Sequence, residues 1–334
     1  MFNEVSAADI DLIRTWSPVD EDLDGVREDI RELFRSMRIQ FGFADIVRSK
    51  QWSGVEGIDE LLDIPYIDDG TRAHLLDVYL PHDAVLRRGN TLPVFIDIHG
   101  GGYTYGYKEL NKNFCLRLAE KGFAVFSINY RLAPTASFVD QLSDVAAAFR
   151  WISDHLAEFP VDPHSVFVTG DSAGGTLGFY GAALSLNEDF AVALGIAPCP
   201  LPIKGAALVS SLFNVEALSN VDGTSHAPFI NRIADTFFDQ RFRSLEPKYR
   251  RYEDMVAELT LPPFYLNTCS EDFLEDENLL LAARLVQAGK SVWIEDWVPE
   301  RGSTLGHVFP VGMTWLPESQ AVLERMRKFA YERL

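Results

Sequence analysis

Two short glycine-rich strings contain the residue types that acyl transfer needs. Residues 170–175 read GDSAGG and residues 99–103 read HGGGY, with His99 standing 73 positions before Ser172. Glycines in a G-x-S-x-G pattern let a strand and a helix approach closely, so that the serine occupies a strained turn with its hydroxyl exposed. A serine hydroxyl is a weak nucleophile at neutral pH and needs a general base. The pattern predicts Ser172 as a nucleophile; a chance match in a glycine-containing turn is the alternative.

The HGGGY string directly follows Pro-Val-Phe-Ile-Asp-Ile, which has the composition of a buried strand. Three consecutive glycines cost backbone entropy, which is understandable where unusual backbone angles must expose N–H groups. Backbone N–H groups that are fixed in advance stabilise charge that develops only in the transition state. We therefore expect the N–H groups of Gly101 and Gly102, with that of Ala173, to form an oxyanion hole. His99 is expected to hold the loop by hydrogen bonding rather than to act as the base.

Short apolar runs alternate with helical patterns from residue 75 onward. Several runs are continuously apolar, as expected for strands buried on both faces of a parallel sheet. Strands that alternate with crossover helices indicate an α/β protein with a doubly wound, mostly parallel sheet and helices on both faces. The runs expected as strands are Leu75–Leu80, Pro93–Ile98, Ala124–Asn129, Val166–Thr169, Ala206–Ser210, Phe264–Thr268 and Val292–Trp297.

Apolar residues at helical spacing predict the helices around these strands. The clearest face recurs at alternating spacings of four and three and consists of Phe138, Leu142, Val145, Phe149, Ile152 and Leu156. Further helices are expected directly after Ser172, over Leu279–Ala288 before Gly289, and from Pro317 onward.

Two segments do not follow the alternation of strands and helices. Residues 213–260 are charged, aromatic and helix-like, and residues 1–60 carry an amphipathic helix with Ile30, Leu33, Phe34, Met37 and Phe41 on one face. We predict that residues 61–212 and 261–334 form the core and that the other two segments form a helical cap over one end of the sheet. Peripheral decoration of the fold is the alternative.

The two glycine-rich strings, together with YRLAP at residues 130–134, resemble the hormone-sensitive lipase family of α/β hydrolases. This family includes bacterial carboxylesterases and arylacetamide deacetylases, and the resemblance implies an α/β-hydrolase fold with a catalytic triad. The acid of the family sits in a D-P-L-x-D-E string, which residues 272–277 match as DFLEDE, and its histidine sits in an H-x-F string, which residues 307–309 match. Carried over to this sequence, the triad is Ser172, Asp272 and His307.

The order of residues along the chain supports the same base and acid. Only His226 and His307 follow Ser172, and His226 falls in the second cap segment. Asp272 follows an expected strand, where a triad acid should stand. Asp276 is the rival acid, but we expect it to begin the following helix, where the N-terminal dipole favours a carboxylate.

The sequence departs from the family pattern near YRLAP and in the acid loop. Thr135 and Val139 replace the usual Glu and Pro, and Phe273 replaces the Pro that usually follows the acid. None of these changes removes a catalytic group. We expect Phe273 to reshape the acid loop.

The composition disfavours several kinds of partner. The 334 residues include 30 basic and 49 acidic side chains, a formal net charge of −19, which argues against binding to nucleic acid or to an anionic membrane. The amino-terminal segment has neither the basic nor the continuous apolar region of a signal peptide. Three scattered cysteines favour buried free thiols over disulfides. We expect a cytoplasmic protein without a membrane anchor.

These observations favour a serine carboxylesterase that hydrolyses short- to medium-chain acyl esters and needs no cofactor or metal ion. Tyr103 and Phe309 adjoin the catalytic strings and are candidates for the substrate pocket, with core packing as the alternative. An amidase or deacetylase on the same triad and a non-catalytic binding protein of the same fold stay open as other functions. The family resemblance also allows a homodimer.

Overall fold

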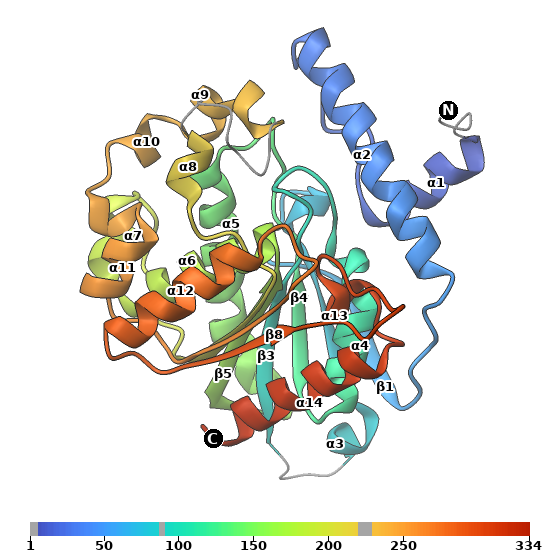
Figure 1. Cartoon of the computed structure of the whole chain (residues 1–334), viewed down its shortest axis with the longest axis vertical. Helices are drawn as coiled ribbons and strands as arrows, with labels where there is room; N and C mark the ends of the chain where they lie inside the picture. Colours follow the sequence, from blue (N-terminus) through green and yellow to red (C-terminus); the bar gives the residue numbers. More distant parts are fainter. Residues whose placement is uncertain (1–5, 87–90, 220–228) are drawn as a thin grey trace.

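One sheet of eight strands runs through the described part of the chain (Figure 1). The computed structural model describes residues 6–86, 91–219 and 229–334. The strands lie in the order β1-β2-β4-β3-β5-β6-β7-β8. Their bounds are β1 Ile58–Pro65, β2 Leu75–Pro81, β3 Leu92–Ile98, β4 Ala124–Ile128, β5 Val161–Asp171, β6 Ile203–Val209, β7 Phe264–Cys269 and β8 Val292–Trp297. The β1–β2 and β2–β4 pairs are antiparallel and the other pairs are parallel.

Helices cover both faces of this sheet, as the sequence predicted. The buried cluster on one face includes residues of α4, α13 and α14, and the cluster on the other includes residues of α5, α6 and α12. The α-helices are α1 Ala7–Trp16, α2 Glu28–Ser49, α3 His82–Leu86, α4 Lys112–Glu120, α5 Phe138–His155, α6 Ala173–Leu186, α7 Glu188–Ala193, α8 Val215–Ser219, α9 Ala234–Phe237, α10 Gln240–Arg243, α11 Tyr252–Glu258, α12 Glu275–Gln287, α13 Phe309–Gly312 and α14 Pro317–Tyr331.

Helix α5 illustrates why the sequence pattern predicts these elements well. The Ser137 hydroxyl accepts a hydrogen bond from the Asp140 N–H at 3.1 Å, and the Asp140 carboxylate accepts one from the Ser137 N–H at 3.0 Å. This capping box satisfies two N–H groups that the first turn would otherwise leave unpaired. The predicted face of α5 is buried from Phe138 to Ile152. The helix therefore packs on the sheet through the residues that the spacing selected.

Within the described ranges, strand β1 is the one strand that the sequence-based prediction lacks. Its sequence, IDELLDIP, mixes acidic and apolar residues, and its side chains are exposed or half-buried. It pairs antiparallel with β2 at the edge of the sheet, where a strand needs no continuous apolar run. The predicted border between the first cap segment and the core, at residue 60, falls inside this strand.

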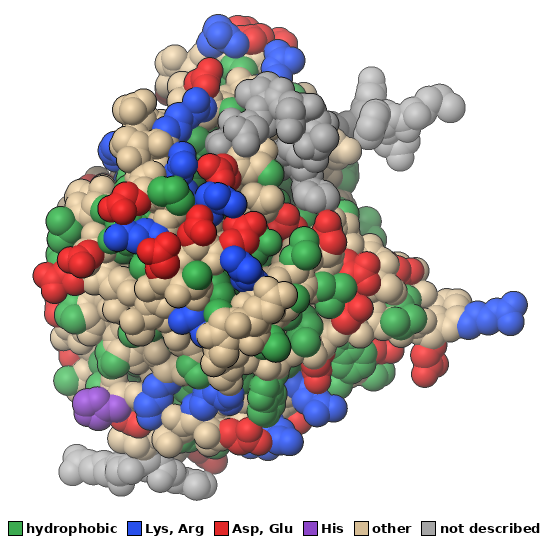
Figure 2. All heavy atoms as spheres, turned by 60° about the vertical axis from the view of Figure 1, so that its left-hand side comes forward, with side chains coloured by type: hydrophobic (Ala, Val, Ile, Leu, Met, Phe, Trp, Pro, Cys, Tyr) green, Lys and Arg blue, Asp and Glu red, His purple; other side chains and the backbone are tan. Residues whose placement is uncertain are grey.

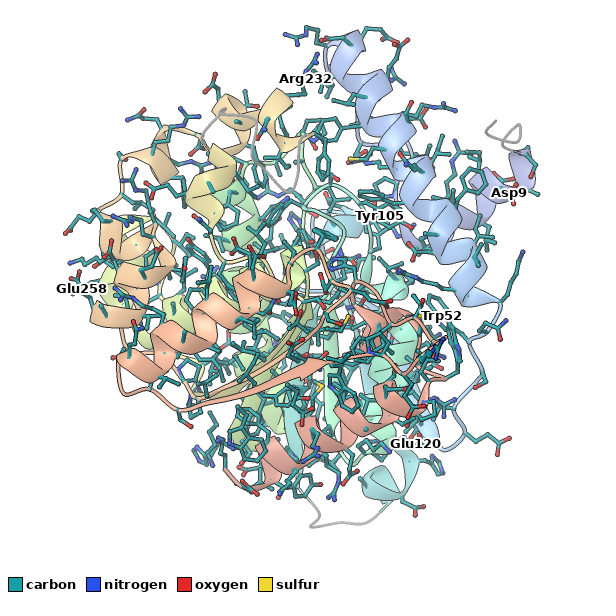
Figure 3. All side chains as sticks on the ribbon, viewed as in Figure 1. Asp9, Trp52, Tyr105, Glu120, Arg232 and Glu258 are labelled. Carbon is teal, nitrogen blue, oxygen red and sulfur yellow. The ribbon has the colours of Figure 1, made fainter. Side chains whose placement is uncertain are left out.

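Helix α2 of the first predicted cap segment and helices α8 to α10 of the second lie toward the same end of the molecule in Figure 1. Helices α1 and α2 of the first segment pack together through a buried cluster that includes Ile13, Trp16, Ile39 and Tyr105. Tyr105, labelled in Figure 3, belongs to the loop after β3 and lies between α2 and the sheet. The second segment contributes α8 to α11 to the large core cluster. Their role as a cap stays a prediction.

The surface and the cysteines show two further properties of the chain. Acidic and basic side chains are interspersed on the face drawn in Figure 2. Cys115, Cys199 and Cys269 are buried free thiols, as the sequence predicted. Within the described ranges, no helix combines the length and the apolar composition needed to cross a bilayer.

Candidate active site

Ser172 occupies the tight turn between β5 and α6. Its backbone angles, φ 51° and ψ −119°, lie in a region that non-glycine residues rarely adopt. The neighbouring Gly174 explains how α6 can begin there, because a Cβ on it would lie 2.0 Å from the Ile98 carbonyl oxygen at the end of β3. Only glycine allows this approach of helix and strand. The turn therefore holds Ser172 at the carboxyl edge of the sheet.

His307 and Asp272 reach Ser172 from the loops that follow β8 and β7. The His307 Nε2 atom lies 3.0 Å from the Ser172 Oγ atom, and the His307 Nδ1 atom lies 2.9 Å from the Asp272 Oδ1 atom. The same carboxylate oxygen accepts a hydrogen bond from the Leu274 N–H at 2.9 Å. Asp276, the rival acid, is exposed at the first turn of α12. The structure thus brings Asp272, and not Asp276, to the histidine.

The electrostatics of the acid favour its charged form. Burial of Asp272 acts to raise its pKa, but the hydrogen bond and charge of His307 and the contact with the Ser210 hydroxyl outweigh burial, so the pKa lies below its ordinary value. An ionised Asp272 accepts the Nδ1–H of the imidazole. The Nε2 lone pair of His307 is then directed at the serine hydroxyl.

His99 belongs to the loop and not to the group of residues around the serine. Its ring is fully buried, stacks on Tyr130 with a centroid distance of 4.4 Å, and places Nδ1 2.8 Å from the Gly100 carbonyl oxygen. Burial lowers the pKa of His99 to about 4, so the ring is neutral at physiological pH. The Tyr130 hydroxyl donates to the His99 carbonyl oxygen at 2.9 Å. These contacts fit the loop-holding role that the sequence predicted.

Three backbone N–H groups lie beside the nucleophile. Gly101, Gly102 and Ala173 all line the same cavity as Ser172, and among the described residues their N–H groups have no hydrogen-bond acceptor. Gly101 has φ +110°, and a Cβ on it would lie 1.9 Å from the Tyr105 carbonyl oxygen, so no other residue fits this backbone. The loop is therefore shaped by glycine in a way that leaves donors available.

A buried carboxylate pair ties this loop to the sheet. The Asp171 Oδ1 atom accepts hydrogen bonds from the Gly100 N–H at 3.0 Å and from the Asn111 amide at 2.8 Å. The Asn111 amide also reaches the Asp97 Oδ1 atom at 3.2 Å, and the Ser127 hydroxyl donates to Asp97 at 2.9 Å. Burial, together with the nearby Asp171 carboxylate, raises the pKa of Asp97 to about 7.

A cavity of about 470 Å³ opens over Ser172 and His307. The loop after β3 forms one wall, and a single face of α2, which packs against this loop, forms another. This face was not predicted as part of the site, although its periodic spacing marks it as one side of a helix. The α2 residues that line the cavity are Met37, Gln40, Phe41, Ala44, Asp45 and Arg48.

The two aromatic residues predicted to line the pocket, Tyr103 and Phe309, lie in different surroundings. Tyr103 lines the cavity, and its hydroxyl donates to the Thr176 hydroxyl at 3.0 Å. Phe309 does not line it: the ring is fully buried in the core cluster with α4 and α14, so the pocket prediction for Phe309 is wrong. Val308, whose backbone has φ 53°, faces the cavity instead and turns the next residue toward the core.

Phe273 is a cavity residue whose position the sequence did not reveal. Its ring lies 4.4 Å from the His307 ring and lines the cavity, although it is half-exposed. The only sequence signal was its departure from the family pattern next to the acid. His226, the alternative histidine, lies outside the described residues. In the part of the chain that the structure describes, no cluster of three or more His, Cys, Asp or Glu side chains could hold a metal ion.

Comparison with known families identifies the class of protein. A family model described as alpha/beta hydrolase fold matches residues 95–301. This is more than half of the chain, and the chain belongs to this family of hormone-sensitive lipase-like proteins. The fold described above is the α/β-hydrolase fold, with the serine on the turn after β5.

Several curated proteins are similar in sequence. Carboxylesterase NlhH from Mycobacterium tuberculosis is 29% identical over 244 residues, which cover 71% of this chain and 69% of that protein. The probable carboxylic ester hydrolase LipM from the same organism is 38% identical over 127 residues, which cover 38% of this chain and 28% of LipM. For esterase LipQ the covered share of the relative is 37%, so the chain spans about a third of the length of LipM and LipQ.

Solved structures show a similar backbone. Esterase B from Lactobacillus rhamnosis, in a crystal structure with a C4-C4 tributyrin phosphonate, has a TM-score of 0.80 and is 26% identical, covering 92% of this chain and 96% of that chain. An esterase from Pyrobaculum calidifontis, with a TM-score of 0.66 and 23% identity, shares the fold.

Proposed function

We propose that this protein is a serine carboxylesterase that hydrolyses short- to medium-chain acyl esters. The observation that carries the proposal is the continuous chain of contacts from the Asp272 carboxylate through the His307 imidazole to the Ser172 hydroxyl, at 2.9 Å and 3.0 Å. Both distances are within hydrogen-bond reach. The names of similar proteins, carboxylesterases and an acetyl-hydrolase, support the same reaction class.

The first half of the reaction forms an acyl-enzyme. The Ser172 oxygen attacks the ester carbonyl carbon while His307 Nε2 takes the hydroxyl proton, and Asp272 stabilises the resulting imidazolium. The negative charge that develops on the carbonyl oxygen is bound by the N–H groups of Gly101, Gly102 and Ala173. The tetrahedral intermediate then collapses, the C–O bond to the alcohol breaks, and His307 gives its proton to the departing alkoxide.

The second half returns the enzyme to its starting state. A water molecule gives a proton to His307 and attacks the acyl-Ser172 carbonyl carbon, and the same three N–H groups bind the oxyanion. Collapse of this intermediate releases the carboxylic acid and returns the proton to Ser172. Each proton moves through one nitrogen atom, His307 Nε2, because Nδ1 is hydrogen-bonded to Asp272 throughout.

The cavity supports a small substrate. A volume of about 470 Å³ lies in the range of sites for small organic molecules. Residues of both predicted cap segments line it, Phe41 and Arg48 from the first and Leu218 and Phe229 from the second. We propose that these segments act as a cap over the ester. The cytoplasmic location and the homodimer stay predictions.

A panel of p-nitrophenyl esters from acetate to laurate, assayed with the wild type and with Ser172→Ala, tests the proposal. We expect a maximum at acyl chains of about eight carbons or fewer, because a cavity of this volume suits a small ester. Ser172→Ala should lower turnover by roughly four to six orders of magnitude without changing the thermal melting temperature. Maximal activity on laurate would contradict the chain-length preference, and ester hydrolysis that survives Ser172→Ala would contradict the mechanism.

A further inference from the structure

The α2 wall of the cavity ends in a charged side chain that the proposed reaction does not use. Met37 and Phe41 line the cavity from the first half of this face, and Asp45 and Arg48 line it from the last turns. The Arg48 side chain retains 30% exposure, whereas that of Asp45 retains 10%. A half-buried guanidinium in the wall of a largely apolar cavity is a candidate for substrate recognition.

A series of interacting side chains holds one side of the Arg48 guanidinium in place. The Arg48 Nη1 atom lies 3.5 Å from the Asp45 Oδ1 atom. The other carboxylate oxygen of Asp45 accepts a hydrogen bond from the Tyr105 hydroxyl at 2.7 Å, and that hydroxyl accepts one from the Trp16 indole N–H at 2.8 Å. Among the described residues, Arg48 makes no hydrogen bond through its side chain beyond this ion pair. Its remaining N–H donors are therefore available to a ligand.

The backbone of α13 provides the space for the guanidinium. A Cβ at Gly312 would lie 3.0 Å from the Nη1 atom and 3.3 Å from the Cζ atom of Arg48. The absence of a side chain at this position thus lets the planar group lie against the backbone. Asp45 on one side and Gly312 on the other define where Arg48 is placed, as a preorganised binding group requires.

The position of Arg48 relates it to the alcohol part of an ester. Gly312 ends α13, which begins two residues after His307. Because His307 gives its proton to the departing alkoxide, the alcohol part lies on the side of this histidine. Next to Gly102 the cavity is lined by the rings of Phe41 and Phe229, which meet edge to face at 6.1 Å.

The charges around Arg48 select the kind of group that it binds. A guanidinium has only donors, so its ligand must present an acceptor oxygen. Asp45 already balances its charge, and a second carboxylate, Asp171, also lines the cavity. An anionic ligand would add negative charge beside these carboxyl groups, whereas a ketone, ether or second ester oxygen would add none.

We propose that Arg48 is a specificity-determining residue that binds a second, uncharged acceptor oxygen in the alcohol part of the ester substrate. This inference rests on the proposed esterase function. Through this contact, Arg48 distinguishes esters of oxygen-bearing alcohols from esters of hydrocarbon alcohols of the same shape.

Three acetate esters of matched shape test the inference. They are 5-acetoxypentan-2-one, 4-methylpentyl acetate and 4-acetoxybutanoate, which differ in presenting a ketone, a branched hydrocarbon or a carboxylate at the same distance from the ester. We expect the wild type to hydrolyse the ketone with the highest kcat/KM. In Arg48→Met the ratio of kcat/KM for the ketone ester to kcat/KM for the hydrocarbon ester should fall about tenfold. Hydrogen bonds to a charged donor are stronger than neutral ones, but partial exposure of this site to water limits the effect.

Further variants separate recognition from folding. Arg35→Met, on the exposed side of α2, should leave the ratio unchanged, since Arg35 contacts Asp20 and not the cavity. Arg48→Gln keeps donors and should restore part of the ratio. Gly312→Ala places a methyl group against the guanidinium and should lower the ratio without removing the arginine.

The outcomes are distinguishable from failure of the esterase proposal. If the wild type hydrolyses none of the three esters nor p-nitrophenyl acetate, the proposed function is wrong and this inference falls with it. If esters are hydrolysed but the ratio is the same in the wild type, Arg48→Met and Gly312→Ala, the subsite is wrong. A preference for 4-acetoxybutanoate that Arg48→Met abolishes would show recognition of an anion and overturn the choice of an uncharged group.

Discussion

Ser172, Asp272 and His307 stand on loops that leave the carboxyl ends of parallel strands, whereas one wall of the cavity stands on a single helix, α2. The backbone hydrogen bonds of β5, β7 and β8 set the positions from which these loops begin. The helix is held largely by side chains: the buried Arg38 donates to the Thr104 carbonyl at 2.7 Å and to the Ala133 carbonyl at 3.3 Å.

This difference separates the residues proposed to carry out the reaction from the residues proposed to recognise the substrate. The groups proposed to make and break bonds are fixed by the fold, so a change of substrate need not disturb them. The groups proposed to select the substrate are on an element whose sequence can change as long as its packing face is kept. The following predictions test this division, starting with the largest expected effect.

Asp272→Asn should lower turnover about 10⁴-fold, because an amide cannot hold the required imidazole tautomer or stabilise the imidazolium. Asp276→Asn is the matched control: its carboxylate is exposed at the start of α12, so turnover should stay near that of the wild type. Steady-state kinetics on p-nitrophenyl acetate measure both. The reverse result, with loss only in Asp276→Asn, would show that the acid has been assigned to the wrong residue.

Gly101→Ala should lower kcat/KM by about 10²- to 10³-fold, the loss typical of removing one oxyanion-hole donor. The added Cβ would lie 1.9 Å from the Tyr105 carbonyl oxygen, so the loop must move away from the site. Gly54→Ala adds the same methyl group in open space and should have no effect. Near-wild-type activity of Gly101→Ala would argue against this loop as the oxyanion hole.

Arg38→Met should change binding more than chemistry. It leaves the Thr104 and Ala133 carbonyls without a buried partner, which costs about 1–3 kcal/mol in the free energy of unfolding. Because α2 then shifts, we expect KM to rise several-fold while kcat changes less. Arg35→Met on the same helix controls for the loss of one charge. A fall in kcat with unchanged KM would mean that α2 also positions the reacting groups.

Asp97→Asn should change the pH dependence of stability and little else. With a pKa of about 7, Asp97 keeps a proton in the folded protein that the unfolded chain releases near pH 4. Between about pH 4 and 7 the folded state binds more protons, so this group makes stability fall as pH rises.

The asparagine variant should flatten that part of the profile and melt a few degrees higher than the wild type at pH 8, as measured by thermal unfolding from pH 4 to 8. An unchanged slope would show that Asp97 is ionised across this range.

The sequence predicted more of the core than of the cavity. All seven expected strands are present, and most of them are apolar runs buried between the two layers of helices. Strand β8, with the sequence VWIEDW, is only partly buried at one edge of the sheet. Strand β1 was not predicted, because an edge strand with acidic residues lacks a continuous apolar run. Phe309 was misplaced because the left-handed backbone at Val308 sends consecutive side chains to opposite sides, and local sequence gives no sign of such a turn at a β-branched residue.

The sequence by itself determined seven of the eight described strands, the nucleophile turn and the candidate members of the triad, since these depend on local patterns and on their order along the chain. Only the tertiary structure decided that Asp272 rather than Asp276 meets His307, that Phe273 lines the cavity, and that Arg48 lies against Gly312. Those contacts join positions far apart in the chain, or depend on which way a loop turns. The spacing of residues cannot specify them before the helices pack on the sheet.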